Sequence, residues 1–401
     1  MSFFGVTIET IGAIEPIKGA DRIVKATLKG MDLSFVVLKD QFQVGSQCVY
    51  IPLDAIVPDA VLEKMGLQGK LGGHAKNRVK TIKLKGTYSQ GIATDLSLIK
   101  DLLAKKKSPK PEEITDFLGI VKYDPESKNE NRDTPEQQDR RTKRWPWHKK
   151  LIRTLFGYSF TKWLYGKPPG VLIPLNTLGL PVYDIEGCNR YKDLTESLMD
   201  KPVWVSLKIE GQNAAVLCRN GKIYVNQRRF TIEKDKNNPL WQIAQSHGFI
   251  ELAQQLGKKF GKEALVYFEA CGSNNGATGI SGNIYGFKEY KGYIFDIKIG
   301  DKFLNIEEIG DALRSVNSAC HQYIVPVLAQ NIKLSEWLKY LNLPSVEKAA
   351  EQKGILNKLG NTLEEGIVIH PMEEQYAHEL GGRLILKFRS KPYLAAKGDD
   401  E

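Results

Sequence analysis

The 401-residue sequence has few cysteines and no long apolar run. Its five cysteines are odd in number, widely spaced and never form a C-x-x-C pair, which argues against a disulfide framework and against a zinc site. No run reaches the roughly 18 apolar residues of a membrane span, and the first residues lack the charged and apolar regions of a signal peptide. We therefore expect a cytoplasmic or otherwise intracellular protein with reduced thiols and no stable membrane association.

The sequence has fewer acidic residues, 47, than lysines and arginines, 57, so its net charge is +10. This excess favours a polyanionic partner, because cations that neutralise phosphates release condensed counterions. A glycine-rich phosphate loop of the G-x-x-x-x-G-K-[ST] kind is absent, which argues against that class of nucleotide-binding protein. The hydrophobic content of 42% suits packed cores, and the length allows two or three domains.

The first hundred residues predict a small β-barrel. Short apolar runs predict strands at 23–28, 35–38 and 48–51, with turns at 30–32 and 44–46. We therefore divide the chain into a barrel domain of the oligonucleotide-binding (OB) type at 1–100, a linker with a basic aromatic insert at 101–170, and a mixed α/β domain at 171–401. The fold class expected from this division is α+β.

A basic run at 76–85 alternates cations with other residues at a period close to two. This pattern predicts a strand that buries Val79, Ile82 and Leu84 imperfectly and offers cations to solvent. Five-stranded OB barrels use such faces to follow a phosphate backbone, whereas an edge strand also carries lysines simply to block aggregation. The candidate nucleic-acid contacts are Lys76, Arg78, Lys80, Lys83 and Lys85.

The middle of the chain has a different composition. Residues 124–140 are almost devoid of apolar side chains, so we expect disorder or a long loop there. Residues 140–167 contain no acidic residue and interleave aromatic side chains with cations. Such a segment packs against a neighbouring domain, binds single strands through charge and base stacking, or lies at a membrane interface, and we favour these in that order.

After position 171 the pattern predicts a mixed α/β domain. The expected strands are 203–207, 214–218, 223–226, 264–268, 293–297, 366–369 and 384–388, and the expected helices are 239–256, 307–318, 334–341 and 346–359. Asn220 and Gly221 form the probable tight turn between the second and third strands, because both tolerate positive φ. This domain supplies the rigid strands on which a site can be built.

Charged residues stand at the ends of these strands. Lys208 follows a strand and precedes Gly211, a K-x-x-G pattern that is common by chance when it stands alone. A lysine becomes a good nucleophile when it is desolvated or surrounded by other cations, and Lys387 and Arg389 lie on one face of the last strand. With Arg228, Glu269 and Glu365, these residues make a plausible site for a nucleoside triphosphate and a divalent metal.

The order of these segments resembles the covalent-lysine nucleotidyltransferase superfamily of ligases and capping enzymes. The segments that carry the resemblance are 208–211 (KIEG), 268–272 (FEACG), 293–297 (YIFDI), 365–368 (EGIV) and 386–389 (LKFR). The spacing is most similar to RNA ligases of the bacteriophage RNA ligase 2 type, in which an asparagine and an arginine follow the lysine where Asn213 and Arg228 stand here. The barrel ahead of the transferase domain, closed by the 88–91 (YSQG) segment, resembles the RNA ligase 5 class.

The resemblance implies a fold and a reaction. The second domain is then a nucleotidyltransferase (ATP-grasp-like ligase) domain, and the protein is expected to be a monomeric ATP-dependent RNA ligase that joins 3′-hydroxyl and 5′-phosphate RNA ends at nicks in duplexes. Lys208 attacks the α-phosphorus of ATP and carries AMP, and AMP then passes to the RNA 5′-phosphate before the 3′-hydroxyl closes the strand. The implied site is catalytic Lys208, Lys387 and Arg389, with nucleotide contacts from Leu207, Glu210, Asn213, Arg228, Glu269, Phe295 and Glu365.

Individual roles also follow from the resemblance. Lys387 contacts the α-phosphate with help from Arg389, Phe295 stacks on the adenine, and Glu269 bonds the ribose. Glu210 and Glu365 hold Mg²⁺ or Mn²⁺ through its waters. Two positions depart from the usual pattern: Glu210 stands where relatives have aspartate, and Arg389 stands where lysine is usual, so a cation remains but with a planar fork.

Other interpretations stay open at the level of the sequence. An mRNA capping-type guanylyltransferase would use the same lysine with GTP. A DNA ligase would normally carry an OB domain after the last motif, where few residues remain here. A catalytically inactive nucleic-acid-binding protein is disfavoured because Lys208, Glu269, Glu365 and Lys387 are all present.

Overall fold

The computed structural model describes residues 4–31, 33–73, 75–123, 151, 154–155, 172–273, 280, 283–352, 359 and 364–399. The loop expected at 124–140 lies outside these residues. The basic aromatic insert at 140–167 also lies outside them, apart from positions 151, 154 and 155.

The N-terminal domain is a nearly closed antiparallel barrel. Its five-stranded sheet has the order β3-β2-β1-β4-β8, formed by β1 (Thr7–Pro16), β2 (Ile23–Leu28), β3 (Ser34–Leu38), β4 (Gln47–Ile51) and β8 (Ile92–Thr94). The amide of Gln90 donates to the Ser34 carbonyl at 2.8 Å, which brings the two edges of the sheet together. The predicted strands and the turns at Gly30 and Gly45, both with positive φ, are confirmed.

The basic run does not form the continuous strand that its alternation predicts. Only β6 (Ile82–Leu84) is a strand, paired with β7 (Thr87–Ser89) across a turn. Upstream, Val79 exchanges backbone hydrogen bonds with Asp54 and Ala55, so its side chain is buried in the barrel core. Ile82 and Leu84 are exposed instead, which corrects the expectation that they are buried.

Helices extend the packed N-terminal unit beyond position 100. The short elements here are β5 (Ala55–Ile56), α1 (Asp59–Met65), η1 (Leu96–Ile99), α2 (Lys100–Lys105), α3 (Pro111–Leu118) and β9 (Val121–Lys122). Ile114 and Leu118 of α3 are buried against Val49 and Ile51 of the barrel. The lysine- and proline-rich stretch at 105–111 is thus the connection between α2 and α3.

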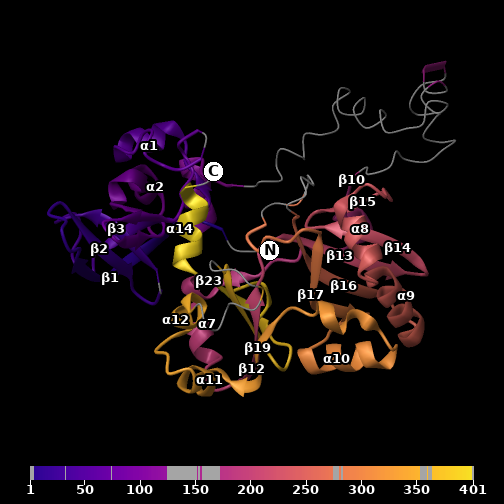
Figure 1. Cartoon of the computed structure of the whole chain (residues 1–401). Coiled ribbons are helices and arrows are strands. Elements are labelled where there is room, and N and C mark those ends of the chain that lie inside the picture. The colour runs from indigo at the N-terminus through magenta and orange to yellow at the C-terminus, as the bar shows by residue number, and fades with distance from the viewer. Residues whose placement is uncertain are drawn as a thin grey trace.

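The first sheet of the C-terminal domain is seven-stranded, with the order β10-β15-β14-β13-β16-β17-β18. Its strands are β10 (Leu172–Pro174), β13 (Gln212–Arg219), β14 (Lys222–Gln227), β15 (Phe230–Ile232), β16 (Ala264–Cys271), β17 (Lys291–Ile299) and β18 (Lys302–Phe303). Asn220 and Gly221 both have positive φ in the β13–β14 turn, as predicted. Figure 1 shows helices α8 (Pro239–Ser246) and α9 (Phe249–Phe260) lying against this sheet.

The prediction of a single helix at 239–256 is wrong, because the helical conformation is interrupted between α8 and α9. Gly248 has φ +75°, a left-handed conformation that ends the helical path and starts a second helix. Both helices still bury one apolar face against the sheet, through residues such as Ile243 and Leu252. The strand residues that meet them are Ala214, Val216 and Cys218, which alternate along β13, whereas Ala215 and Leu217 on its other face belong to a smaller apolar cluster.

The second sheet of this domain is five-stranded, with the order β11-β23-β20-β12-β19. Its strands are β11 (Glu186–Gly187), β12 (Pro202–Lys208), β19 (Val327–Lys333), β20 (Gly366–Pro371) and β23 (Leu386–Arg389). Around the two sheets lie η2 (Leu175–Leu178), η3 (Cys188–Arg190), α7 (Lys192–Ser197), α10 (Ile306–Ser315), η4 (Ala319–Tyr323), α11 (Leu334–Tyr340), α12 (Val346–Glu351) and the small hairpin β21 (Tyr376–Ala377) with β22 (Gly382–Arg383). The strands predicted at 203–207, 366–369 and 384–388 are confirmed within a few residues at their ends.

The last helix, α14 (Lys391–Asp399), follows β23 directly and contacts β6 of the barrel. Figure 1 shows this yellow helix beside the indigo and purple N-terminal domain. All five cysteines are buried and free, as the composition suggested. Among the residues described, no helix combines the length and the apolar character needed to cross a bilayer.

Candidate active site

A cavity of about 450 Å³ contains most of the predicted site residues. It is lined from the seven-stranded sheet by residues such as Asn213, Glu269 and Phe295, and from the five-stranded sheet by residues such as Lys208 and Lys387. Its size falls in the range of small-molecule sites. The remaining lining residues are Tyr183, Asp184, Ile185, Ser206, Leu207, Ile209, Gly211, Gln212, Arg228, Val325, Val368 and His370.

Lys208 is the last residue of β12 and stands opposite Gly366 of β20. Its Nζ lies 2.9 Å from Oε2 of Glu365, which directly precedes that glycine. Lys208 is largely shielded from solvent and Glu365 is buried. The strand pairing therefore places the predicted nucleophile and a predicted metal-binding carboxylate in contact.

The glycines of two motifs are required by close backbone approach. A Cβ at Gly211 would stand 2.4 Å from the carbonyl oxygen of Ala270, so only glycine lets the chain after Lys208 pass β16. Gly366 has φ +146°, and a Cβ there would stand 1.9 Å from the Phe388 carbonyl oxygen. The K-x-x-G spacing thus has a steric cause: the chain turns from one sheet to the other just after the lysine.

Lys387 and Arg389 share one face of β23, as predicted from their spacing. Burial lowers the pKa of Lys387 to about 8; the nearby Arg389 and Lys208 cations add to this effect, and the Asp184 and Glu186 carboxylates oppose it. Lys387 lines the cavity, whereas Arg389 lies opposite Gly366 at the end of the strand pair. The site thus has a concentration of positive charge suited to phosphate.

Glu269 and Asn213 are cross-strand partners on the cavity face of β16 and β13. Burial raises the pKa of Glu269 to about 8; the Lys208 ammonium opposes the rise, and the Glu365 carboxylate adds to it. A carboxyl that is partly protonated near neutral pH can donate as well as accept a hydrogen bond. Phe295, on β17, presents a ring to the same cavity, and this ring packs edge-on against Tyr183 with centroids 5.3 Å apart.

Several cavity residues were missed by the sequence reasoning. Asp184 accepts a 2.7 Å hydrogen bond from Arg228, and it lies in a segment without regular periodicity that gave no signal. His370 could have been found, since it follows Val368 by two positions on β20 and so shares its face. Its ring stacks on Trp204 with centroids 3.8 Å apart, and burial, with the Arg383 cation, holds the pKa of His370 well below its ordinary value.

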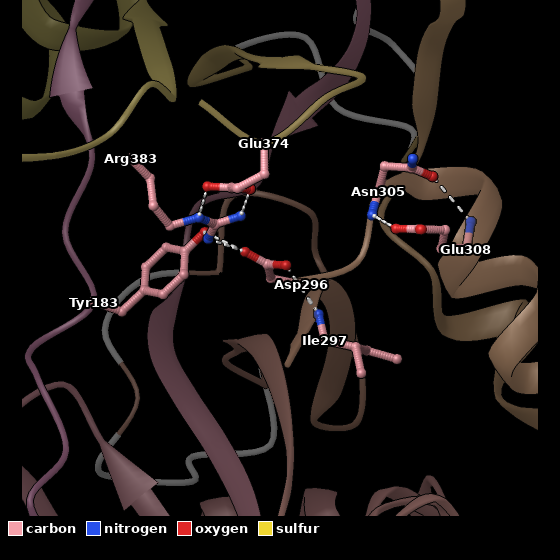
Figure 2. A network of polar contacts seen from close by, with 7 residues as sticks. All are labelled: Tyr183, Asp296, Ile297, Asn305, Glu308, Glu374 and Arg383. Carbon is pink, nitrogen blue, oxygen red and sulfur yellow. Dashed lines mark hydrogen bonds and ion pairs between the residues drawn. The ribbon is translucent and has the colours of Figure 1, made fainter. Parts of the chain in front are cut away.

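A polar network that includes the cavity residue Tyr183 joins three segments that are distant in the sequence (Figure 2). Asp296, next to Phe295, accepts hydrogen bonds from the Tyr183 hydroxyl at 2.7 Å and from Arg383 at 2.5 Å. Arg383 also donates to both carboxylate oxygens of Glu374, at 2.5 and 2.8 Å. Burial raises the pKa of Asp296, and the Arg383 cation opposes that rise. The network fixes the backbone that carries Phe295.

The carboxylates of Glu210 and Glu365 fit a hard cation that keeps part of its water shell. Both side chains are buried, Glu365 is in contact with Lys208, and both carboxylates raise the pKa of Glu269. Within the part of the chain that the structure describes, no group of three or more histidine, cysteine, aspartate or glutamate side chains is arranged to hold a metal by itself. Mg²⁺ commonly binds through one or two carboxylates together with substrate phosphates, and this donor set agrees with that pattern.

The basic residues predicted to contact nucleic acid differ in their surroundings. Arg78 forms an ion pair with Asp54 at 2.9 Å and stacks over Tyr123 at 3.6 Å, so its guanidinium is engaged within the fold. Lys80 is half-buried, whereas Lys76, Lys83 and Lys85 are exposed. Lys83 lies over the Tyr88 ring at 5.2 Å, which places a cation and an aromatic face together on the β6–β7 hairpin.

Two protein-family models match parts of the chain. A model described as an OB-fold domain matches residues 5–96, and a model described as RNA ligase matches residues 201–389. The second match begins one residue before β12 and ends at Arg389, so it spans every motif of the cavity. A search of curated protein sequences found no match.

Solved structures of Naegleria gruberi RNA ligase have the same fold. A lysine-to-alanine mutant with ATP and Mn has a TM-score of 0.68 and 19% identity, covering 98% of this chain and 99% of that chain. The same ligase with PPi has a TM-score of 0.66 and 21% identity, with 98% of each chain covered. A glutamate-to-alanine mutant with AMP and Mn has a TM-score of 0.67 and 19% identity, covering 98% and 99%.

Proposed function

We propose that this chain is an ATP-dependent RNA ligase with an N-terminal OB domain, and that it joins 3′-hydroxyl and 5′-phosphate RNA ends at nicks in duplexes. The observation that carries this proposal is that Lys208 and Lys387 line one cavity between two sheets, with Glu365 in contact with Lys208. The site is assembled from one chain, so we propose a monomer. A reaction through lysyl-AMP and 5′-adenylated RNA suits this geometry.

In the first step, the Lys208 amine attacks the α-phosphorus of ATP. A P–N bond forms, the bond between the α-phosphorus and the bridging oxygen breaks, and pyrophosphate leaves. The attacking amine must be neutral, and in the structure the Lys208 Nζ lies 2.9 Å from Oε2 of Glu365. Lys387 and Arg389 hold the phosphate, Phe295 packs on the adenine, and Glu269 bonds the ribose, while Leu207, Asn213 and Arg228 complete the nucleotide contacts.

Glu210 and Glu365 would hold Mg²⁺ or Mn²⁺, which neutralises negative charge on the phosphates. Lys208 later acts as the leaving group: an RNA 5′-phosphate oxygen attacks the lysyl-bound phosphorus, and the P–N bond breaks. The RNA 3′-hydroxyl then attacks the adenylated 5′-phosphate, and AMP leaves. Lys387 and Arg389 remain in place to neutralise the transferred phosphates throughout.

RNA reaches the cavity from the barrel in this proposal. Helix α14 directly follows the strand of Lys387 and contacts β6, so the hairpin that carries Lys83 and Lys85 is connected to that strand through one helix. Exposed Lys76, Lys83 and Lys85 would neutralise backbone phosphates, and Tyr88 beside Lys83 offers a stacking face. Lys80 and Arg78, with less exposure, would contribute less.

Labelling with α-radiolabelled nucleotides tests the proposed chemistry. The protein should form a covalent adduct with ATP in the presence of Mg²⁺ or Mn²⁺, and Lys208→Ala should reduce it by more than about 10³-fold because no other amine takes its place. Lys222→Ala, an exposed lysine on β14, is the control and should label normally. Labelling by GTP rather than ATP would instead indicate a capping-type enzyme. A nick series that varies RNA and DNA strands then defines the strands that are sealed.

A further inference from the structure

The buried Ser390 connects the backbone of Glu364 and Glu365, which belongs to the proposed metal site, to helix α14. Ser390 is 4% exposed and directly follows Arg389 of β23. Its backbone amide donates to the carbonyl of Glu365 at 2.8 Å, and its hydroxyl donates to the carbonyl of Glu364 at 3.1 Å. The same hydroxyl oxygen accepts the amide of Tyr393 at 3.2 Å, in the first turn of α14. One side chain therefore joins two segments of the fold.

Glu365 lies where the backbone departs from regular strand geometry. It is followed by Gly366, whose φ of +146° belongs to a backbone region open only to glycine. The regular β20–β23 pairing ends at Gly366 and Arg389. The carboxylate of Glu365 is thus held by the Lys208 ion pair at its tip and by Ser390 at its backbone.

Helix α14, to which Ser390 connects this backbone, is itself held by other elements of the fold. Lys391 forms an ion pair with Glu347 of α12, and α14 contacts β6 of the barrel. Tyr393 is buried, and its pKa is raised by burial first and then by the nearby Glu365 and Glu210 carboxylates. The start of α14 therefore lies beside both acids of the proposed metal site and is held by other elements.

We propose that Ser390 is a positioning residue, whose hydroxyl holds the Glu364–Glu365 backbone against α14 and thereby sets where the Glu365 carboxylate meets the divalent cation. This inference rests on the proposed ligase function. Ser390→Ala keeps the backbone bond to Glu365 but removes the hydroxyl bond to Glu364 and the acceptor for Tyr393. Groups that orient metal ligands typically contribute about 10- to 100-fold to metal affinity.

The first measurement is direct binding of Mn²⁺ in the presence of AMP, followed by electron paramagnetic resonance. Ser390→Ala should weaken Mn²⁺ binding by about tenfold, and Ser390→Thr, which retains a hydroxyl, should restore it. The rate of lysyl-AMP formation should fall at low Mn²⁺ and recover at saturating Mn²⁺, while the KM for ATP at saturating metal stays unchanged. A purely structural role would lower the unfolding midpoint without this metal-dependent recovery.

Ser197→Ala is the matched control, because this exposed serine at the end of α7 also donates to a carbonyl, that of Leu194 at 2.7 Å, and lies away from the cavity. It should bind Mn²⁺ like the wild type. Wild-type Mn²⁺ affinity in folded Ser390→Ala would overturn the inference. If Ser390→Ala does not fold, the same Mn²⁺-binding measurement is made on Ser390→Cys. Failure of the wild type to form lysyl-AMP would contradict the proposed function instead, and the binding titration would still report on Ser390.

Discussion

Lys208 stands in the free protein as the partner of Glu365, with 2.9 Å between their charged atoms. A protonated amine is not a nucleophile, because its lone pair carries a proton. In the proposed reaction, a divalent cation bound by Glu365 would compete with Lys208 for the same carboxylate. The position of Glu365 would therefore affect both the ion pair and the proposed metal site.

Lys387 gives the site a dependence on pH. Burial and the Arg389 cation lower its pKa to about 8, so the free protein loses this positive charge as the pH rises through about 8. Binding of a non-reactive ATP analogue with an α,β-methylene bridge should therefore weaken between pH 7 and pH 9, by about tenfold if one charge-assisted hydrogen bond is lost. Isothermal titration calorimetry across this range measures the effect.

Lys387→Arg provides the comparison, because arginine stays protonated throughout this range. Its affinity for the analogue should fall less steeply between pH 7 and pH 9 than that of the wild type; the fall that remains would come from Glu269, whose pKa is also about 8 and whose ionisation adds negative charge to the cavity. An equally steep loss of affinity in Lys387→Arg would place the titrating group elsewhere.

At the scale of elements, the Arg383 network joins the β21–β22 hairpin to β17 (Figure 2). Removing one partner of a buried pair leaves the other charge uncompensated, at a cost of about 3–5 kcal/mol. Arg383→Met should therefore lower the free energy of unfolding by about 3 kcal/mol, measured by urea denaturation, because Asp296 is 1% exposed. Arg314→Met, which removes an exposed pair with Asp311, should cost less than about 1 kcal/mol. Equal losses in the two variants would show that the network contributes no more than a surface pair.

The strands were the most predictable elements, and the reason is physical. The apolar runs of β13 and β16 are buried on both faces of the sheet, so the local composition already predicts strands there, and the strand register places Asn213 opposite Glu269 at the cavity. The prediction of a continuous strand at 76–85 was wrong, because the charges alternate there but burial does not. Val79 is held inward by backbone hydrogen bonds to Asp54 and Ala55, which are distant in the sequence. Asp184 could not be predicted, because only tertiary contact with Arg228 gives it a role.

At the scale of the whole molecule, the OB domain and the transferase domain meet through the last element of the chain. Helix α14 begins at the strand of Lys387 and contacts β6, so the barrel is attached to the catalytic sheet rather than only tethered to it by the linker. The barrel also includes α2 and α3 in its packed core, which means that removing residues 1–100 alone would expose Ile114 and Leu118. Substitution of surface charges in the intact chain is therefore the better test of the barrel.

Lys76 and Lys85 are exposed, flank β6 without belonging to it, and so can be changed without disturbing the contact with α14. Reversing both charges should leave lysyl-AMP formation unchanged, because ATP binds in the cavity, but should weaken binding to a nicked RNA duplex. If both lysines contact phosphates, the slope of log affinity against log salt should become less steep by about two. Lys18→Glu with Lys64→Glu, two exposed lysines of the same domain, carries the same change in net charge. An equal loss of affinity in this control pair would show that general charge, and not the β6–β7 hairpin, attracts the RNA.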